Sequence, residues 1–253
     1  MINTIKAEWL KERHSSNRSL FWIIPLVFTI FCFLVSMLMG KAESGSISFF
    51  IAAAYNWYPS MISPIVLSLI TSHAIKREDD QRKIDFQLSM NADAKSIWIA
   101  KIFITLLDYS IVTLFNLILA VIIEVTVFQE TTSIGAIIFA SIILIISNSW
   151  LIPFSLLIAY KLNRLMCFAI NVPMTIVGVA FFAAAPAWIY FPWSYSTRMM
   201  APVLGIHPNG TFLAVDSSLM DLSVVVLGII TSFALFILLS VTTTSLFVRS
   251  VKI

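Results

Sequence analysis

Six long apolar stretches divide this chain, and they constrain its fold more than any other feature. Of its 253 residues, 59% are hydrophobic and only 11% are charged, whereas a water-soluble domain carries about a quarter charged residues. Crossing the hydrocarbon core of a bilayer takes about 20 apolar residues. The sequence therefore predicts an all-α, polytopic membrane protein with one transmembrane domain over residues 1–253. We expect its six spans at 20–39, 47–72, 97–123, 134–158, 167–189 and 222–247.

The basic residues fall in alternate gaps between these stretches. All but two of the 16 Lys and Arg residues precede the first span, follow the sixth, or lie near the second-to-third and fourth-to-fifth connections. The exceptions are Lys41 and Arg198. Because Lys and Arg beside spans stay in the cytoplasm, both termini are expected to be cytoplasmic. The formal net charge of +3 then reflects membrane topology and not nucleic-acid binding.

Residues 1–19 are charged but have a helical pattern. Ile2, Ile5, Trp9 and Leu10 share one face, and the charged side chains point elsewhere. This pattern predicts an amphipathic helix lying in the headgroup region. The alternative is a solvated, frayed terminus.

The connection at 73–96 begins with dense mixed charge and then becomes weakly amphipathic. It predicts a short cytoplasmic helix, because an unengaged loop would not need its apolar side chains. An ordinary solvated loop is the alternative. Asn91 or Asp93 is expected to cap the helix that becomes the third span. The apolar residues of this connection are Ile84, Phe86, Leu88 and Met90.

The connection at 190–221 is aromatic, punctuated by proline and poor in charge. It is too apolar for a free loop and too broken for a span. We expect an outer re-entrant segment that packs against neighbouring helices, which satisfy its backbone polar groups.

The second span contains a helix breaker. Pro59 removes a backbone hydrogen bond, and Asn56 can satisfy a freed group. A kink beside Trp57 and Tyr58 would line a cavity. The alternative is a bend within an interfacial belt of aromatic residues.

Asp108 is the deepest ionisable residue within the spans. Counting from Ile97 at ~1.5 Å per residue places it ~16 Å inside, near the bilayer centre. A carboxylate there should face protein or water. It belongs either to a substrate path or proton relay, or to a structural hydrogen bond between helices. Glu124 and Glu130 are expected to be solvated at the outer end.

Sequence signatures of catalysis are missing. No pair of glycines five apart is followed by the Lys and Ser or Thr of a nucleotide-binding loop, and no HExxH or GxSxG motif occurs. His14, His73 and His207 are far apart in the chain, and Cys32 and Cys167 lie in apolar segments. We therefore assign no catalytic residue, cofactor or metal ligand to this chain.

Several segments together resemble the permease subunits of ABC transporters of the drug- and polysaccharide-exporter class. Among these, the chain is most similar to the lantibiotic-immunity permeases of Gram-positive bacteria. The resemblance covers the whole chain. It is carried by the opening IKAEWLKERHSSNRSLFWIIP, by YNWYP in the second span, by the segment from Glu78 to Lys101, by PWSY at 192–195 and by HPNG at 207–210.

The resemblance implies the partners and the activity. Such a permease works in the bacterial cytoplasmic membrane with a separate ATPase dimer that binds ATP and Mg²⁺, and with a second, often non-identical permease. The complex removes an antimicrobial peptide from the membrane lipid, which gives self-immunity. The expected contacts with the ATPase are Glu78, Ile84, Phe86, Leu88 and Met90. The candidates for the substrate path are Asn56, Trp57, Tyr58, Asp108, Trp193 and Tyr195.

Three alternatives remain open from the sequence. An ABC exporter could carry another drug or a lipid-like substrate. An ion-coupled secondary transporter would need ion ligands near the midplane and usually two related halves. Loss of transport in Asp108→Asn without loss of complex assembly would favour ion coupling. A membrane enzyme would need a convergent pair of catalytic groups, which we do not find.

Overall fold

The computed structural model describes residues 2–13, 16–40, 47–79, 93–128, 132–214 and 216–251. Within these ranges the chain is almost wholly helical, and extended backbone pairs only at an isolated bridge between Ile206 and Phe212. Among the described residues, five helices are long and apolar enough to cross a membrane, and a bent pair brings the number to six when it is taken as one span. The predicted all-α, polytopic fold is confirmed.

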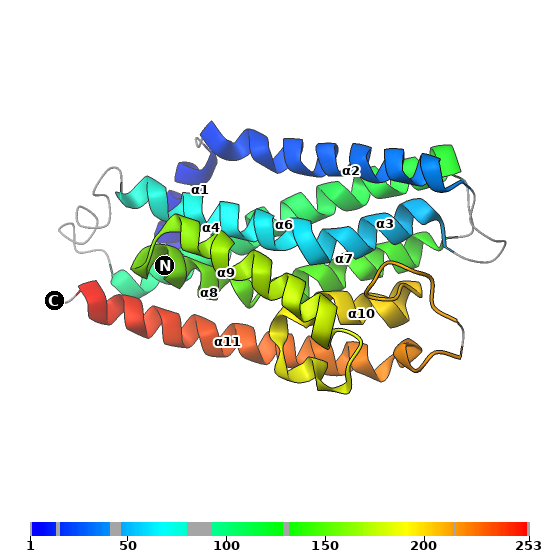
Figure 1. The fold of residues 1–253 in the computed structure, drawn as a ribbon. Helices are drawn as coiled ribbons and strands as arrows, with labels where there is room; N and C mark the ends of the chain where they lie inside the picture. The colour runs from blue at the N-terminus through cyan, green and yellow to red at the C-terminus, as the bar shows by residue number, and fades with distance from the viewer. Residues whose placement is uncertain are drawn as a thin grey trace.

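The six spans run side by side along one bundle, and the two ends of the chain lie at the same end of it (Figure 1). Two spans are single α-helices, and the other four include a π-turn or a bend. In chain order they are α2 (Leu20–Met39); α3 (Phe49–Trp57), the π-turn η2 (Tyr58–Ile62) and α4 (Ser63–Asp79); α6 (Ala94–Ile123) with η3 (Glu124–Phe128); α7 (Ile134–Asn148) and α8 (Leu151–Lys161); α9 (Arg164–Val177) with η4 (Gly178–Phe182); and α11 (Ser223–Val251).

Two predicted spans differ from the structure because of prolines. The fourth is not one straight helix, since α7 and α8 meet at an angle of 40°. Pro153 has no N–H to bond the carbonyl of Ser149, so the helix breaks just before it. The fifth ends at Phe182 rather than near residue 189. Pro186 instead opens the 3₁₀ turn η5 (Pro186–Tyr190).

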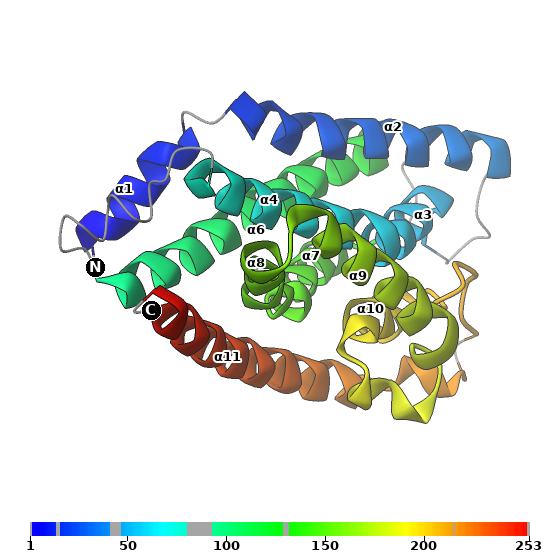
Figure 2. The same cartoon turned by 60° about the vertical axis from the view of Figure 1, so that its left-hand side comes forward.

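A short helix, α1 (Ile2–Arg13), lies obliquely across one end of the bundle and packs on the start of α6 (Figure 2). Its Glu8 and Glu12 are buried, whereas Ile2 and Leu10 are exposed. The helix thus turns two acidic residues toward the protein and leaves two apolar residues exposed, and its place in the membrane interface stays a prediction. Asp93 is the residue that caps α6, because its carboxylate accepts from the backbone N–H groups of Lys95 and Ser96.

The connection at 190–221 packs against the bundle at the end away from α1, which is called the outer end below. After η5 and the short turn η6 (Pro192–Ser194), α10 (Tyr195–Leu204) packs against α7 and α11, and nearly all of its residues are buried. Arg198 within it donates to the carbonyl of Leu219, in the 3₁₀ turn η7 (Ser218–Met220). This long-range bond fixes α10 to the end of the outer connection.

The buried side chains form two clusters, one toward each end of the bundle. The cluster at the outer end joins α3, α7, α10 and the start of α11. The other joins α4, α8, the start of α6 and the end of α11. Hydrogen bonds bind α4, α8 and α9 to one another there: Asn171 Nδ2 donates to Ser68 Oγ (3.1 Å) and Ser155 Oγ (2.7 Å), and Ser68 Oγ donates to the Cys167 carbonyl.

Candidate functional site

Asn56 connects the break in the second span to the outer turn at 207–210. Its Nδ2 donates to the carbonyl oxygens of His207 (3.3 Å) and Pro208 (3.1 Å). Gly210 has φ of +93°, and a Cβ there would lie 3.3 Å from Asn56 Oδ1. Two segments about 150 residues apart in the sequence are therefore held together by one amide. Glycine suits position 210 because of both its φ and its close approach to Asn56.

Tyr58 points into the bundle and not toward an open path. It is fully buried, with its hydroxyl 3.2 Å from Thr113 Oγ1. Next to it on α6, the Tyr109 hydroxyl lies 2.6 Å from Ser63 Oγ and accepts from Asn148 Nδ2 (3.3 Å). This polar cluster links the π-turn of the second span to the bend between α7 and α8. Breaks of this kind often mark functional sites in helices.

Trp57 faces the opposite way. It is 42% exposed and packs edge-to-face on Phe31 of α2, with ring centroids 5.7 Å apart. With Met61 it lines an almost wholly apolar groove of about 490 Å³ beside α2. Successive residues of a helix point about 100° apart, so Asn56, Trp57 and Tyr58 cannot line one path together.

Trp193 and Tyr195 also diverge. Trp193 packs edge-to-face on Trp150, with centroids 4.9 Å apart, at the bend between α7 and α8. Neither indole N–H has an acceptor within the part of the chain that the structure describes. Tyr195 instead lies against Trp188, and its hydroxyl donates to the carbonyl of Ile189 (2.6 Å). Trp193 thus reaches the bend, and Tyr195 holds the re-entrant segment together.

Two carboxylates of the third span are buried, Asp108 in α6 and Glu124 in η3. Asp108 is 3% exposed and lies against protein, as the cost of a carboxylate in lipid requires. The expectation that Glu124 is solvated is wrong, since it is 2% exposed and Ser48 Oγ donates to its Oε2 (2.6 Å). Ser48 also caps α3 by accepting from the N–H of Ile51. Glu124 therefore joins η3, which follows α6, to the start of α3, whereas Glu130 lies outside the described residues.

At the other end of the bundle, an ion pair fixes α1 to α6. Lys101 is only 2% exposed, and its Nζ lies 3.2 Å from Glu8, which also pairs with Lys11 (2.6 Å). Burial alone would raise the pKa of the Glu8 carboxyl and is the largest single influence. The two ammonium groups and their hydrogen bonds outweigh it, so this pKa lies below its ordinary value. Sequence reasoning missed Glu8, although a lysine within an apolar span requires an anionic partner.

One of the expected ATPase contacts, Glu78, lies at this same end. Glu78 belongs to the last turn of α4, which stops at Asp79, and α6 begins at Ala94. The other four, Ile84, Phe86, Leu88 and Met90, lie outside the described residues. The connection that carries them therefore joins two packed helices, one of which also bears α1.

These features define a class of protein, a multi-pass helical membrane protein whose polar side chains join breaks in its spans. Within the described residues, no group of three His, Cys, Asp or Glu side chains is arranged to hold a metal. The sequence model of a family described as "ABC-2 family transporter protein" matches residues 4–183, well over half of the chain. The chain belongs to this family. It is thus the membrane permease of an ABC transporter, a component that works with an ABC ATPase.

The family match runs from α1 through η4, and it includes the connection between α4 and α6. The re-entrant segment and α11 follow the matched residues. No curated protein and no solved structure matches the chain.

Proposed function

We propose that this permease expels a membrane-active antimicrobial peptide of the lantibiotic class from the bacterial cytoplasmic membrane and so gives self-immunity. A separate ATPase dimer, with its ATP and Mg²⁺, supplies the energy, and a second, non-identical permease completes the complex. Family membership supports the transporter class. The substrate class rests on the resemblance carried by IKAEWLKERHSSNRSLFWIIP, YNWYP, PWSY and HPNG.

The observation that supports this proposal most is the gathering of α1, the end of α4 and the start of α6 at one end of the bundle. An ATPase bound at residues 78–92 would act on both α4 and α6, because this connection joins them directly. Through Lys101 and Glu8 it would also act on α1. With both termini cytoplasmic, this end faces the nucleotide-binding partner.

The packing offers a route from this end to the outer face. α4 continues through η2 into α3, and Asn56 at that junction holds the outer turn by two hydrogen bonds. A displacement of α4 would therefore reach the turn at 207–210. Nucleotide drives such a change only because it binds the two states of the ATPase with different affinity.

The ATPase contact is tested by the double substitution Phe86→Asp and Leu88→Asp. We expect the permease to insert and the ATPase to be lost on co-purification, because two carboxylates would replace apolar contacts. The matched control is Leu162→Asp with Leu165→Asp, which adds the same charge at two exposed leucines, one in the turn after α8 and one in the first turn of α9. Co-purification of the ATPase with the Phe86/Leu88 variant at the control level would rule out this contact.

The substrate class is tested by expressing the chain with its genomic neighbours in a sensitive host. Growth is measured across a panel of lantibiotics, with an active and with a hydrolysis-dead ATPase. We expect protection against at least one peptide, and only with the active ATPase. Assembly of the complex without protection would refute the peptide substrate and leave the permease assignment standing.

A further inference from the structure

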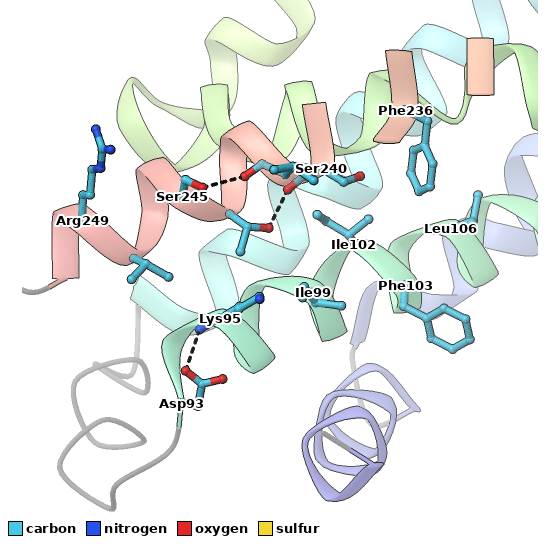
Figure 3. A pocket seen from close by; sticks show the side chains of 13 residues that line it. Asp93, Lys95, Ile99, Ile102, Phe103, Leu106, Phe236, Ser240, Ser245 and Arg249 are labelled. Carbon is cyan, nitrogen blue, oxygen red and sulfur yellow. Dashed lines mark hydrogen bonds between the residues drawn. The ribbon is translucent and has the colours of Figure 1, made fainter. Parts of the chain in front are cut away.

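A groove of about 780 Å³ runs between α6 and α11 on the outside of the bundle (Figure 3). Its walls are apolar for most of their length, with Ile99, Phe103 and Leu106 from α6 facing Phe236 and Val241 from α11. This volume is in the range of sites that bind small molecules.

The hydroxyl groups on the α11 wall do little to change this apolar character. Thr244 Oγ1 donates to the carbonyl of Ser240 (2.6 Å), and Ser245 Oγ donates to that of Val241 (3.0 Å). These two hydroxyls are thus satisfied within their own helix, whereas the buried Ser240 Oγ, from the same wall, has no hydrogen-bond partner within the described residues. A molecule bound in the groove would contact mainly the methyl and methylene groups of this wall. The groove exists because these side chains are short and do not fill the space between the two helices.

The length of the groove matches one leaflet of a bilayer. From Asp93 to Leu106 on α6, and from Arg249 back to Phe236 on α11, each wall rises ~20 Å at ~1.5 Å per residue. Half of a bilayer, with its headgroup region, is also ~20 Å thick. Because α6 and α11 run in opposite directions, the charged residues of both walls lie at the same end.

That end carries basic groups. Lys95 extends along α6 toward Ile99, and Arg249 extends outward from the last turns of α11 (Figure 3). Both are exposed, and within the described ranges neither forms an ion pair. The nearby carboxylate of Asp93 is already engaged as the cap of α6. The mouth therefore holds two cations, one from each helix, against the single carboxylate of Asp93, which interacts with Lys95, and this leaves a net positive charge for an anion.

We propose that this groove binds one anionic phospholipid, with its phosphate at Lys95 and Arg249 and an acyl chain along the apolar walls. Basic pockets between spans on the cytoplasmic side bind such headgroups. The groove covers a single leaflet, so it fits a lipid better than a helix of a second permease, which would need contact over the full ~30 Å of the hydrocarbon core. Nothing in this inference depends on the peptide substrate.

The test uses the full chain and native mass spectrometry with phosphatidylglycerol and phosphatidylcholine. Each basic residue near an anionic group contributes about a fivefold gain in affinity. The double variant Lys95→Gln and Arg249→Gln should therefore weaken phosphatidylglycerol binding about 25-fold. The matched control, Lys161→Gln with Arg164→Gln, removes two basic residues of the same end that do not line the groove, and should weaken it less than threefold.

A second variant separates the groove from general surface charge. Ser245→Trp fills the exposed apolar wall without changing the charge, and should weaken phosphatidylglycerol binding at least tenfold. Three results would overturn the proposal. These are an equal effect of the control pair, unchanged binding in Ser245→Trp, or a change in oligomeric mass instead of lipid binding, which would identify a second copy as the occupant.

Discussion

Replacing Asn56 with leucine should release the outer turn from the second span. Leucine is similar in size but cannot donate to the two carbonyl groups at His207 and Pro208. The His207 carbonyl keeps its bond from the N–H of Gly210 (2.7 Å), so its loss matters less. Pro208 is buried, and Asn56 is the donor found for its carbonyl within the described residues.

The expected magnitude follows from these two bonds. A neutral hydrogen bond contributes about 0.5–1.5 kcal/mol, and leaving a buried acceptor unsatisfied costs about 1–3 kcal/mol. We therefore expect the variant to lose about 2 kcal/mol of the free energy that keeps the turn docked. At about 1.4 kcal/mol per factor of ten, the opening equilibrium should rise about 30-fold.

Hydrogen–deuterium exchange measures this opening directly. The turn has three backbone bonds to report it, from the N–H groups of His207, Gly210 and Leu213. Their protection in peptides over 205–213 should fall about 30-fold in Asn56→Leu, with peptides from α11 unchanged. Ser60→Ala is the control, because its hydroxyl bonds only carbonyls of its own helix. Equal protection in wild type and Asn56→Leu, or an equal loss in the control, would refute the proposed connection.

Two further predictions concern the fixing of the re-entrant segment and of α1. Gly178→Ala should lower the thermal midpoint, because its Cβ would lie 3.0–3.1 Å from the backbone next to it in η6, and overpacking costs about 1–3 kcal/mol. Gly135→Ala, where the nearest atom is 3.5 Å away, should be neutral or stabilising; a similar loss in both would contradict the packing. The pKa of the Glu8 carboxyl is lowered in the folded protein. The ion pair therefore contributes its full stability at pH values above the ordinary carboxyl pKa, and this stability is lost as the pH falls through the lowered pKa. A spin label at an Ile2→Cys site should therefore stay immobile at neutral and mildly acidic pH and become mobile only below the ordinary carboxyl pKa. In Glu8→Gln the label should be mobile at every pH. A label that becomes mobile already near pH 6 with Glu8 present would be inconsistent with this ion pair.

The spans were predictable because crossing lipid imposes length and apolarity on each one. The limits of α2 match the prediction, and Pro59 indicated the helix break that the structure shows as the π-turn η2. The bend before Pro153 was missed because its stretch is apolar throughout, and hydropathy does not register a missing N–H. Pro186 could have marked the early end of the fifth span for the same reason.

The contacts of the candidate site were less predictable, because they join residues that are distant in the chain. Asn56 was identified as a group able to satisfy freed backbone, but one sequence does not reveal that this backbone lies at 207–208. Buried Glu124 looked like a solvated end residue, since nothing local indicates its hydrogen bond from Ser48. Likewise, Glu8 and Lys101 are 93 positions apart.

The second, fourth and fifth spans each contain a π-turn or a bend, but their segments α4, α8 and α9 are regular α-helices. Hydrogen bonds from Asn171 join these three helices. They form one unit at the end of the bundle near α1, and none of the three can tilt alone without breaking those bonds. Toward the outer end, each of the three helices meets a π-turn or a bend. Because the connection proposed to contact the ATPase joins α4 to α6, we expect a small tilt of this unit relative to α2 and α11 to rearrange the outer half of the bundle.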